Sequence, residues 1–137
     1  MRGLINKTKA FGQILSESTN KTLTLYHGTC EENGIALIKS GWQPSTKNYG
    51  GNMGNPSYLY LSSEPEDALW FAEEKGCNTI IEVINIPIDY LMSDPEDEAG
   101  FTMKDLLDRV DISGFPAKFA LTKPLNSSHF KKWVKKK

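Results

Sequence analysis

The chain has 137 residues, 39% of them hydrophobic and 24% charged, and its formal net charge is −1. This length and balance predict one globular domain with one core and exclude an intrinsically disordered chain. A net charge near zero gives no overall field for a polyanionic partner. No apolar stretch is long enough to span a bilayer, so we expect no membrane partner.

Charged residues nevertheless cluster in two places, an acidic run at 94–98 and a lysine-rich end at 131–137. We interpret them as a solvated loop and a solvated tail, with weak contact to an acidic partner as the alternative role of the tail. Apolar residues recur at helical intervals over 4–18. We therefore divide the chain into an amphipathic helical extension at 1–20, a folded domain at 21–130 and a basic tail at 131–137.

Two cysteines are present, Cys30 and Cys77. No His, Cys or Asp lies around them at the spacing of metal ligands, so we expect no metal site. No leader peptide is recognisable, so we expect two reduced thiols in a cytoplasmic protein.

The domain begins with a predicted strand and helix. Residues 22–27 alternate between apolar and polar side chains, which is typical of a half-buried strand. Residues 31–41 then predict a helix that Gly41 ends. The Gly- and Pro-rich segment 42–57 is predicted to be a loop, either functional or mobile. Trp42 at its start either covers a ligand or packs on its own domain.

A second strand–helix pair follows the loop. Residues 58–63 alternate leucine with polar or tyrosine side chains and predict a strand. Residues 63–76 predict a helix that starts with a capping box of Ser63 and Glu66. We expect at least one of the two large side chains of this helix in the core: Trp70 or Phe71.

The remaining elements complete the predicted fold. Residues 79–87 are rich in isoleucine and valine and predict a strand, 102–110 predict a helix, and 118–124 predict the last strand, with a helical turn after it. Strands and helices are mixed without a regular parallel βαβ series. We therefore predict an α+β fold, with a single domain built on a split or strongly bent mixed or antiparallel sheet flanked by helices.

His27 is the most informative side chain, because it ends the first strand and a glycine follows it. A strand-end histidine is either structural or catalytic, and nothing local decides between the two roles. The other histidine, His129, lies in a polar stretch and is interpreted as a surface residue. Neither cysteine lies in a nucleophile motif, and no phosphate-binding loop is present.

Three segments taken together favour the catalytic role of His27 over the structural one: "YHGT" at 26–29, "YLYLSSEPEDALWFA" at 58–72 and "IIEVINIP" at 80–87. In this order the chain resembles the ADP-ribosyltransferase-like superfamily, especially its small divergent members in bacteria and their phages. The resemblance covers residues 23–125. It implies that NAD is the cofactor.

The resemblance also implies residue roles. In that superfamily the histidine that ends the first strand contacts the nicotinamide-side ribose, which would be His27, and the next glycine holds the carboxamide through its backbone, which would be Gly28. A tyrosine of the second motif strand stacks on the nicotinamide ring, which would be Tyr60. The full set expected at the cofactor is Tyr26, His27, Gly28, Thr29, Tyr58, Tyr60 and Ser62.

These residue types suit such a ligand. Tyrosine offers an aromatic face at low entropic cost, and a backbone without a Cβ in the way offers a donor and an acceptor to a carboxamide. The alternative is that Tyr58 and Tyr60 only fill a half-exposed strand surface.

The chain departs from the family at the third motif, a glutamate at the start of a late strand that stabilises positive charge on the ribose. Here Ala117 and Lys118 stand near that position. Three replacements are open. Asp111 takes the role if the last strand is aligned differently, or the acidic loop brings in Glu96 or Glu98. The third is Glu82, which is either a partly buried carboxylate of interest or an edge residue, and it completes the catalytic set expected here: His27, Tyr60 and Glu82.

The resemblance thus implies an NAD-dependent ADP-ribosyltransferase, a transferase of glycosyl type. Its acceptor is a host or cellular macromolecule, a protein rather than a nucleic acid, and the protein acts in the host cytoplasm if a phage encodes it. The missing glutamate motivates the alternative, a catalytically silent module of the same fold that binds NAD, ADP-ribose or a protein partner. An RNA 2′-phosphotransferase is more remote, because few basic residues beyond His27, Lys118 and Arg109 can line its cleft.

Overall fold

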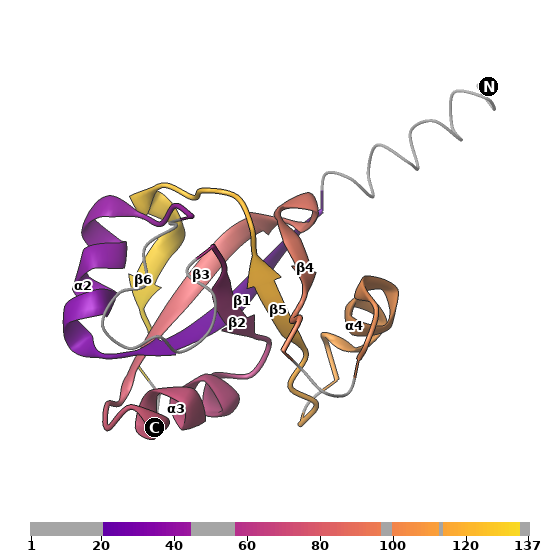
Figure 1. The fold of residues 1–137 in the computed structure, drawn as a ribbon, viewed down its shortest axis with the longest axis horizontal. Helices are drawn as coiled ribbons and strands as arrows, with labels where there is room; N and C mark the ends of the chain where they lie inside the picture. Colours follow the sequence, from indigo (N-terminus) through magenta and orange to yellow (C-terminus); the bar gives the residue numbers. More distant parts are fainter. Residues whose placement is uncertain (1–20, 45–56, 97–99, 113, 135–137) are drawn as a thin grey trace.

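The computed structural model describes residues 21–44, 57–96, 100–112 and 114–134. They form a small α+β domain in which six antiparallel strands make one sheet with the order β4-β5-β2-β1-β3-β6 (Figure 1). The predicted α+β class and single domain are confirmed. The predicted extension at 1–20 and the centre of the 42–57 loop lie outside the described residues, as does Glu98.

The elements follow one another along the chain without repeats. Their bounds are β1 Thr22–Thr29, α2 Glu31–Ser40, β2 Leu59–Ser62, α3 Pro65–Glu74, β3 Thr79–Pro87, η1 Ile88–Tyr90, β4 Leu91–Ser93, α4 Met103–Arg109, β5 Lys118–Leu121, η2 Ser127–His129 and β6 Phe130–Lys132.

The core lies on one face of the sheet, where strand alternation places apolar side chains. Leu59 and Leu61 of β2 are buried there, as the alternation at 58–63 predicts, together with Ile81 and Val83 of β3 and Phe119 of β5. The predicted helix ending at Gly41 is also confirmed, because Gly41 caps α2 with a φ of 76°.

The join between β1 and β2 has the fewest ladder pairs of the sheet among the described residues. A single pair, Tyr26 with Ser62, is in register between these strands. By contrast, β1 and β3 are in register at seven pairs from Thr22 to Thr29. C-terminal to Tyr26, the edge of β1 that faces β2 therefore has no ladder pairing among the described residues.

The start of α3 corrects one sequence prediction. Ser63 and Glu66 do not form a capping box, because the N-cap is Glu64 and no side chain caps it. The Ser63 hydroxyl instead donates to the Phe115 carbonyl (3.2 Å) and accepts from the Ala117 backbone N–H (2.9 Å). Ser63 therefore ties the end of β2 to the segment that leads into β5, and this tertiary contact outcompetes the local cap.

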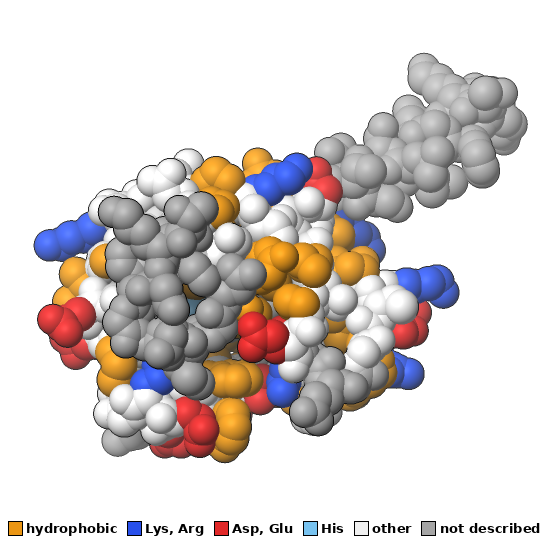
Figure 2. All heavy atoms as spheres, viewed as in Figure 1, with side chains coloured by type: hydrophobic (Ala, Val, Ile, Leu, Met, Phe, Trp, Pro, Cys, Tyr) orange, Lys and Arg blue, Asp and Glu red, His pale blue; other side chains and the backbone are white. Residues whose placement is uncertain are grey.

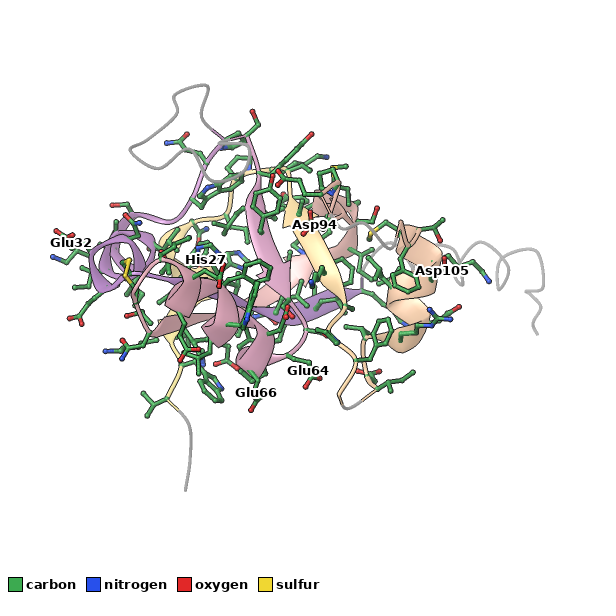
Figure 3. The ribbon with its side chains drawn as sticks, turned by 60° about the horizontal axis from the view of Figure 1, so that its bottom comes forward. His27, Glu32, Glu64, Glu66, Asp94 and Asp105 are labelled. Atoms are coloured by element: carbon green, nitrogen blue, oxygen red, sulfur yellow. A yellow bond between two sulfur atoms is a disulfide. The ribbon has the colours of Figure 1, made fainter. Side chains whose placement is uncertain are left out.

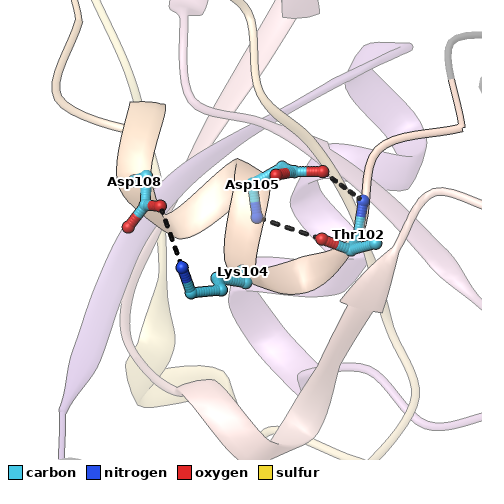
Figure 4. A network of polar contacts seen from close by, with 4 residues as sticks. All are labelled: Thr102, Lys104, Asp105 and Asp108. Atoms are coloured by element: carbon cyan, nitrogen blue, oxygen red, sulfur yellow. Dashed lines mark hydrogen bonds and ion pairs between the residues drawn. The ribbon is translucent and has the colours of Figure 1, made fainter.

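A capping box is present at α4 instead (Figure 4). The Asp105 backbone N–H donates to the Thr102 hydroxyl (3.2 Å), and the Thr102 backbone N–H donates to the Asp105 carboxylate (3.3 Å). The bond from the Thr102 backbone N–H, and after it the interaction with the Thr102 side chain, hold the pKa of the Asp105 carboxyl group below its ordinary value. One turn further on, Lys104 and Asp108 form an exposed ion pair.

Two strands were not predicted. β4 is a three-residue strand at one edge of the sheet, and β6 is a three-residue strand at the other. The prediction that 118–124 holds the last strand is wrong, because β6 follows the helical turn η2 and pairs with β3. Lys131 and Lys132, placed in the tail by sequence, belong to β6.

Both large side chains of α3 are exposed, against expectation: Trp70 is 54% and Phe71 is 38% exposed. The buried residues of α3 are the small Ala68 and Ala72. They bring the helix backbone so close to β1 that a Cβ on Gly28 would overlap the Ala68 carbonyl. A helix that packs through its backbone turns its bulky residues outward.

The expectation of two reduced thiols is also wrong. Cys30 and Cys77 form a disulfide, with Cα atoms 5.0 Å apart across 47 residues of sequence. Cys30 is the N-cap of α2, and Cys77 follows the turn after α3. The disulfide therefore joins the end of β1 to the start of β3, and it is typical of a non-reducing environment.

Candidate functional site

A cavity of about 600 Å³ lies where β1 and β2 separate, between the sheet, α3 and the segment after β4. Its volume is in the range of small-molecule sites. Five of the seven residues expected at the cofactor line it, and Figure 3 shows where His27 and Asp94 lie relative to α3 and β5. These five are Tyr26, His27, Gly28, Tyr60 and Ser62.

His27 bridges the join between β1 and β2. Its Nδ1 is 2.8 Å from the Tyr60 carbonyl oxygen. A carbonyl oxygen only accepts, so Nδ1 carries the proton and donates it. Burial, and secondarily the charge of Lys75, lowers the imidazole pKa to about 4 although the Tyr60 bond opposes the shift. The ring is therefore neutral at pH 7, and its Nε2 is an acceptor for a hydroxyl group such as that of a ribose.

Gly28 is a glycine for a packing reason. A Cβ there would stand 1.7 Å from the Ala68 carbonyl oxygen of α3. No other residue allows this close approach of helix and strand. The same approach makes the Gly28 backbone part of the cavity wall beside α3.

Tyr60 stands opposite, on β2. Its hydroxyl donates to the Glu96 carboxylate at 2.7 Å, and its ring contacts that of Tyr58 edge-on with centroids 6.3 Å apart. The Glu96 backbone N–H donates to the Asp94 side chain at 2.8 Å. Asp94 and Glu96 both line the cavity, so part of the acidic run interpreted as a solvated loop belongs to the site.

Lys118 also lines the cavity, at the start of β5 where the family glutamate is expected. Its ammonium lies 5.5 Å from the centroid of the Phe71 ring, a cation–π distance. The Trp70 ring contacts the Phe71 ring edge-on at 5.2 Å. Exposed aromatic rings and a lysine thus form one rim of the cavity.

Lys75 lines the cavity near the other end of α3. Loss of solvation lowers the pKa of its ammonium. The pKa of the Tyr26 phenol is shifted in the opposite direction and is raised. Burial is the first cause, followed by the negative charges of Glu82, Glu64 and Glu66. Tyr26 therefore remains protonated throughout the physiological range.

The other expected site residues lie elsewhere. Thr29 is buried, and the Tyr58 ring contacts the Tyr60 ring outside the cavity lining. Glu82 pairs with Tyr26 on one side and with Lys131 on the other. None of these three lines the cavity. Asp111 is exposed just after α4. Trp42 is a partly buried residue packed against the core, and its backbone pairs with Leu125.

Sequence reasoning missed the contribution of α3 to the cavity wall: Ala68, Trp70, Phe71, Glu74 and Lys75. The one available signal was the pair of small residues Ala68 and Ala72 at helical spacing opposite Gly28. His129, interpreted as a surface residue, is partly buried, with its Nδ1 2.8 Å from the Ile84 carbonyl oxygen.

In the space-filling view of Figure 2, hydrophobic side chains gather near the middle of the face, next to acidic ones.

Among the described residues, no group of three or more His, Cys, Asp or Glu side chains is placed to hold a metal ion. In the same part of the chain, no helix has the length and apolar character needed to cross a membrane. Comparison of the chain with protein-family models, curated proteins and solved structures finds no match.

Proposed function

We propose that the protein is an NAD-dependent ADP-ribosyltransferase and that the cavity between β1 and β2 is its NAD site. The observation that carries the proposal is the convergence of His27, Gly28 and Tyr60 on one cavity of suitable size. These residues come from two strands that are far apart in sequence, and they are the ones that the family resemblance named.

The residues in the cavity fit the ligand. The neutral His27 ring presents Nε2 as an acceptor for a ribose hydroxyl. Gly28 and Tyr60 both line the cavity, which supports assigning the Gly28 backbone to the carboxamide and the Tyr60 ring to the nicotinamide. The strand order supports the same assignment, because β1, β2 and β5, the three motif strands of the family, are adjacent in the sheet.

The test is release of nicotinamide from NAD, measured for the wild type, His27→Asn and His129→Asn. The two histidines are matched, since each is partly buried and holds a backbone carbonyl through Nδ1 at 2.8 Å, but His129 does not line the cavity. We expect His27→Asn to lose about tenfold or more in kcat/KM, as the loss of one hydrogen bond to substrate implies, and His129→Asn to keep its activity. The proposal would be refuted if calorimetry detected no binding of NAD to the wild type.

One observation favours a second candidate, a catalytically silent module that binds NAD or ADP-ribose. Lys118, a cation, lines the cavity at the start of β5. A cation there opposes positive charge on the ribose. This candidate predicts calorimetric binding of NAD by the wild type without any nicotinamide released.

A further inference from the structure

We propose that Glu96 is the carboxylate that faces the ribose, a role that rests on the proposed function and that no residue of β5 can take. Its Oε2 accepts a hydrogen bond from the Tyr60 hydroxyl at 2.7 Å, and its side chain lines the same cavity as His27 and Gly28. A carboxylate bonded to the residue that stacks on nicotinamide lies next to the bond that must break.

The position of Glu96 is fixed by a chain of backbone contacts that starts on the sheet. β4 pairs with β5, with Ser93 opposite Phe119. The Asp94 backbone N–H then donates to the Lys118 carbonyl at 3.1 Å, and the Asp94 side chain accepts from the Glu96 backbone N–H at 2.8 Å. The carboxylate thus reaches the cavity from the turn that follows β4, the strand beside the one where the family carries it.

The chemistry needs a negative charge at this place. NAD supplies a ribose carbon whose bond to the nicotinamide nitrogen breaks, and the bonding electron pair leaves on nicotinamide, which departs neutral. The acceptor's oxygen or nitrogen forms the new bond to that carbon and passes its proton to the Glu96 carboxylate, which releases it to water. A fixed carboxylate stabilises the positive charge that develops on the sugar and serves as the base.

The competing acidic residues lack this contact. Neither Glu82 nor Asp111 lines the cavity. Glu74 lines the cavity from α3, and Asp94 is engaged in holding the Glu96 backbone. The Lys118 ammonium lies 5.5 Å from the centroid of the Phe71 ring, at the aromatic rim of the cavity.

The experiment uses the full chain as wild type, Glu96→Gln and the control Glu32→Gln, which changes an exposed residue of α2 that does not line the cavity. Calorimetry measures binding of NAD and of two ribose analogues, a pyrrolidine that is cationic at neutral pH and its uncharged tetrahydrofuran counterpart. We expect Glu96→Gln to weaken binding of the cationic analogue about tenfold, as loss of a charged hydrogen bond implies. The affinities for NAD and for the uncharged analogue should stay within about threefold of the wild-type values. Nicotinamide release should fall about 100-fold, in kcat rather than KM.

The outcomes separate the two proposals. If the wild type turns over NAD and Glu96→Gln matches it in kcat and in binding the cation, the role of Glu96 is overturned and the proposed function stands. If the wild type binds NAD without turnover, the role of Glu96 is overturned in favour of the silent module. If the wild type binds no NAD, the proposed function itself fails, and the Glu96 assignment fails with it. Equal losses in Glu32→Gln would also overturn the assignment.

Discussion

Acid should destabilise this protein through His27, and the size of the effect follows from the structure. The folded ring has a pKa of about 4, against an ordinary value of 6.5. Between these values the unfolded chain binds a proton that the folded protein does not, so the free energy of unfolding falls as pH falls from 6.5 to 4. The full difference is about 3 kcal/mol, and about 2 kcal/mol of it is lost between pH 7 and pH 4.5.

The assay is urea unfolding followed by tryptophan fluorescence at pH 7 and pH 4.5, for the wild type and for His27→Gln. Glutamine does not titrate, and its amide can still donate to the Tyr60 carbonyl. Carboxylates that titrate near pH 4 act on both proteins, so the difference between the two pH profiles isolates the imidazole. Profiles that run parallel within about 0.5 kcal/mol would show that the ring is not buried as a neutral donor.

Three further changes test the contacts around the cavity. Gly28→Ala should lower the free energy of unfolding by about 3 kcal/mol or more, because the new Cβ overpacks against Ala68. Gly76→Ala should lower it by only about 1 kcal/mol, because Gly76 has a φ of 77° but open space at its Cβ. Equal losses in chemical unfolding would contradict the close approach of α3. Replacing Cys30 and Cys77 by serine should lower the free energy of unfolding by about 4 kcal/mol, the chain-entropy value for a loop of 47 residues; an unchanged urea midpoint would argue against the disulfide. Tyr60→Phe removes the bond to Glu96 and keeps the ring, so nicotinamide affinity should change by less than about threefold while kcat falls; a large loss of affinity would show that the hydroxyl, and not the ring, binds nicotinamide.

Sequence was sufficient for the elements with a strong local pattern. The β3 strand ends at Pro87 as predicted, and β2 buries Leu59 and Leu61 together, because alternation and turn residues report directly on a half-buried strand. β4 and β6 have three residues each, too few for a period to show, and both exist because a distant strand edge pairs with them.

Other features depend on distances that a sequence does not contain. The outward position of Trp70 depends on the glycine in β1 that lets α3 pack through its alanines. The Cys30–Cys77 bond depends on the ends of β1 and α3 meeting. Serine and glutamate at the right spacing predict a capping box, but the Ser63 hydroxyl is hydrogen-bonded to the backbone of the segment before β5.

The candidate site shows the same division. His27, Gly28 and Tyr60 were predicted together from the family resemblance, and they line one cavity. Glu96 was one of several replacements open from the sequence, and no pattern could choose among them. Its place is set by the pairing of β4 with β5, a contact between segments that the sequence did not identify as neighbours.

The join between β1 and β2 also has a mechanical meaning. Between β2 and β1, one ladder pair and one imidazole–carbonyl bond join the half of the sheet made of β4, β5 and β2 to the half made of β1, β3 and β6 among the described residues, and the two halves also share one hydrophobic core. Force that pulls the two halves of the sheet apart acts on this join, and residues of the join line the cavity: Tyr26, His27 and Ser62. A ligand bound in the cavity would contact both halves of the sheet. The force at which a single stretched molecule ruptures should therefore rise when the cavity is occupied.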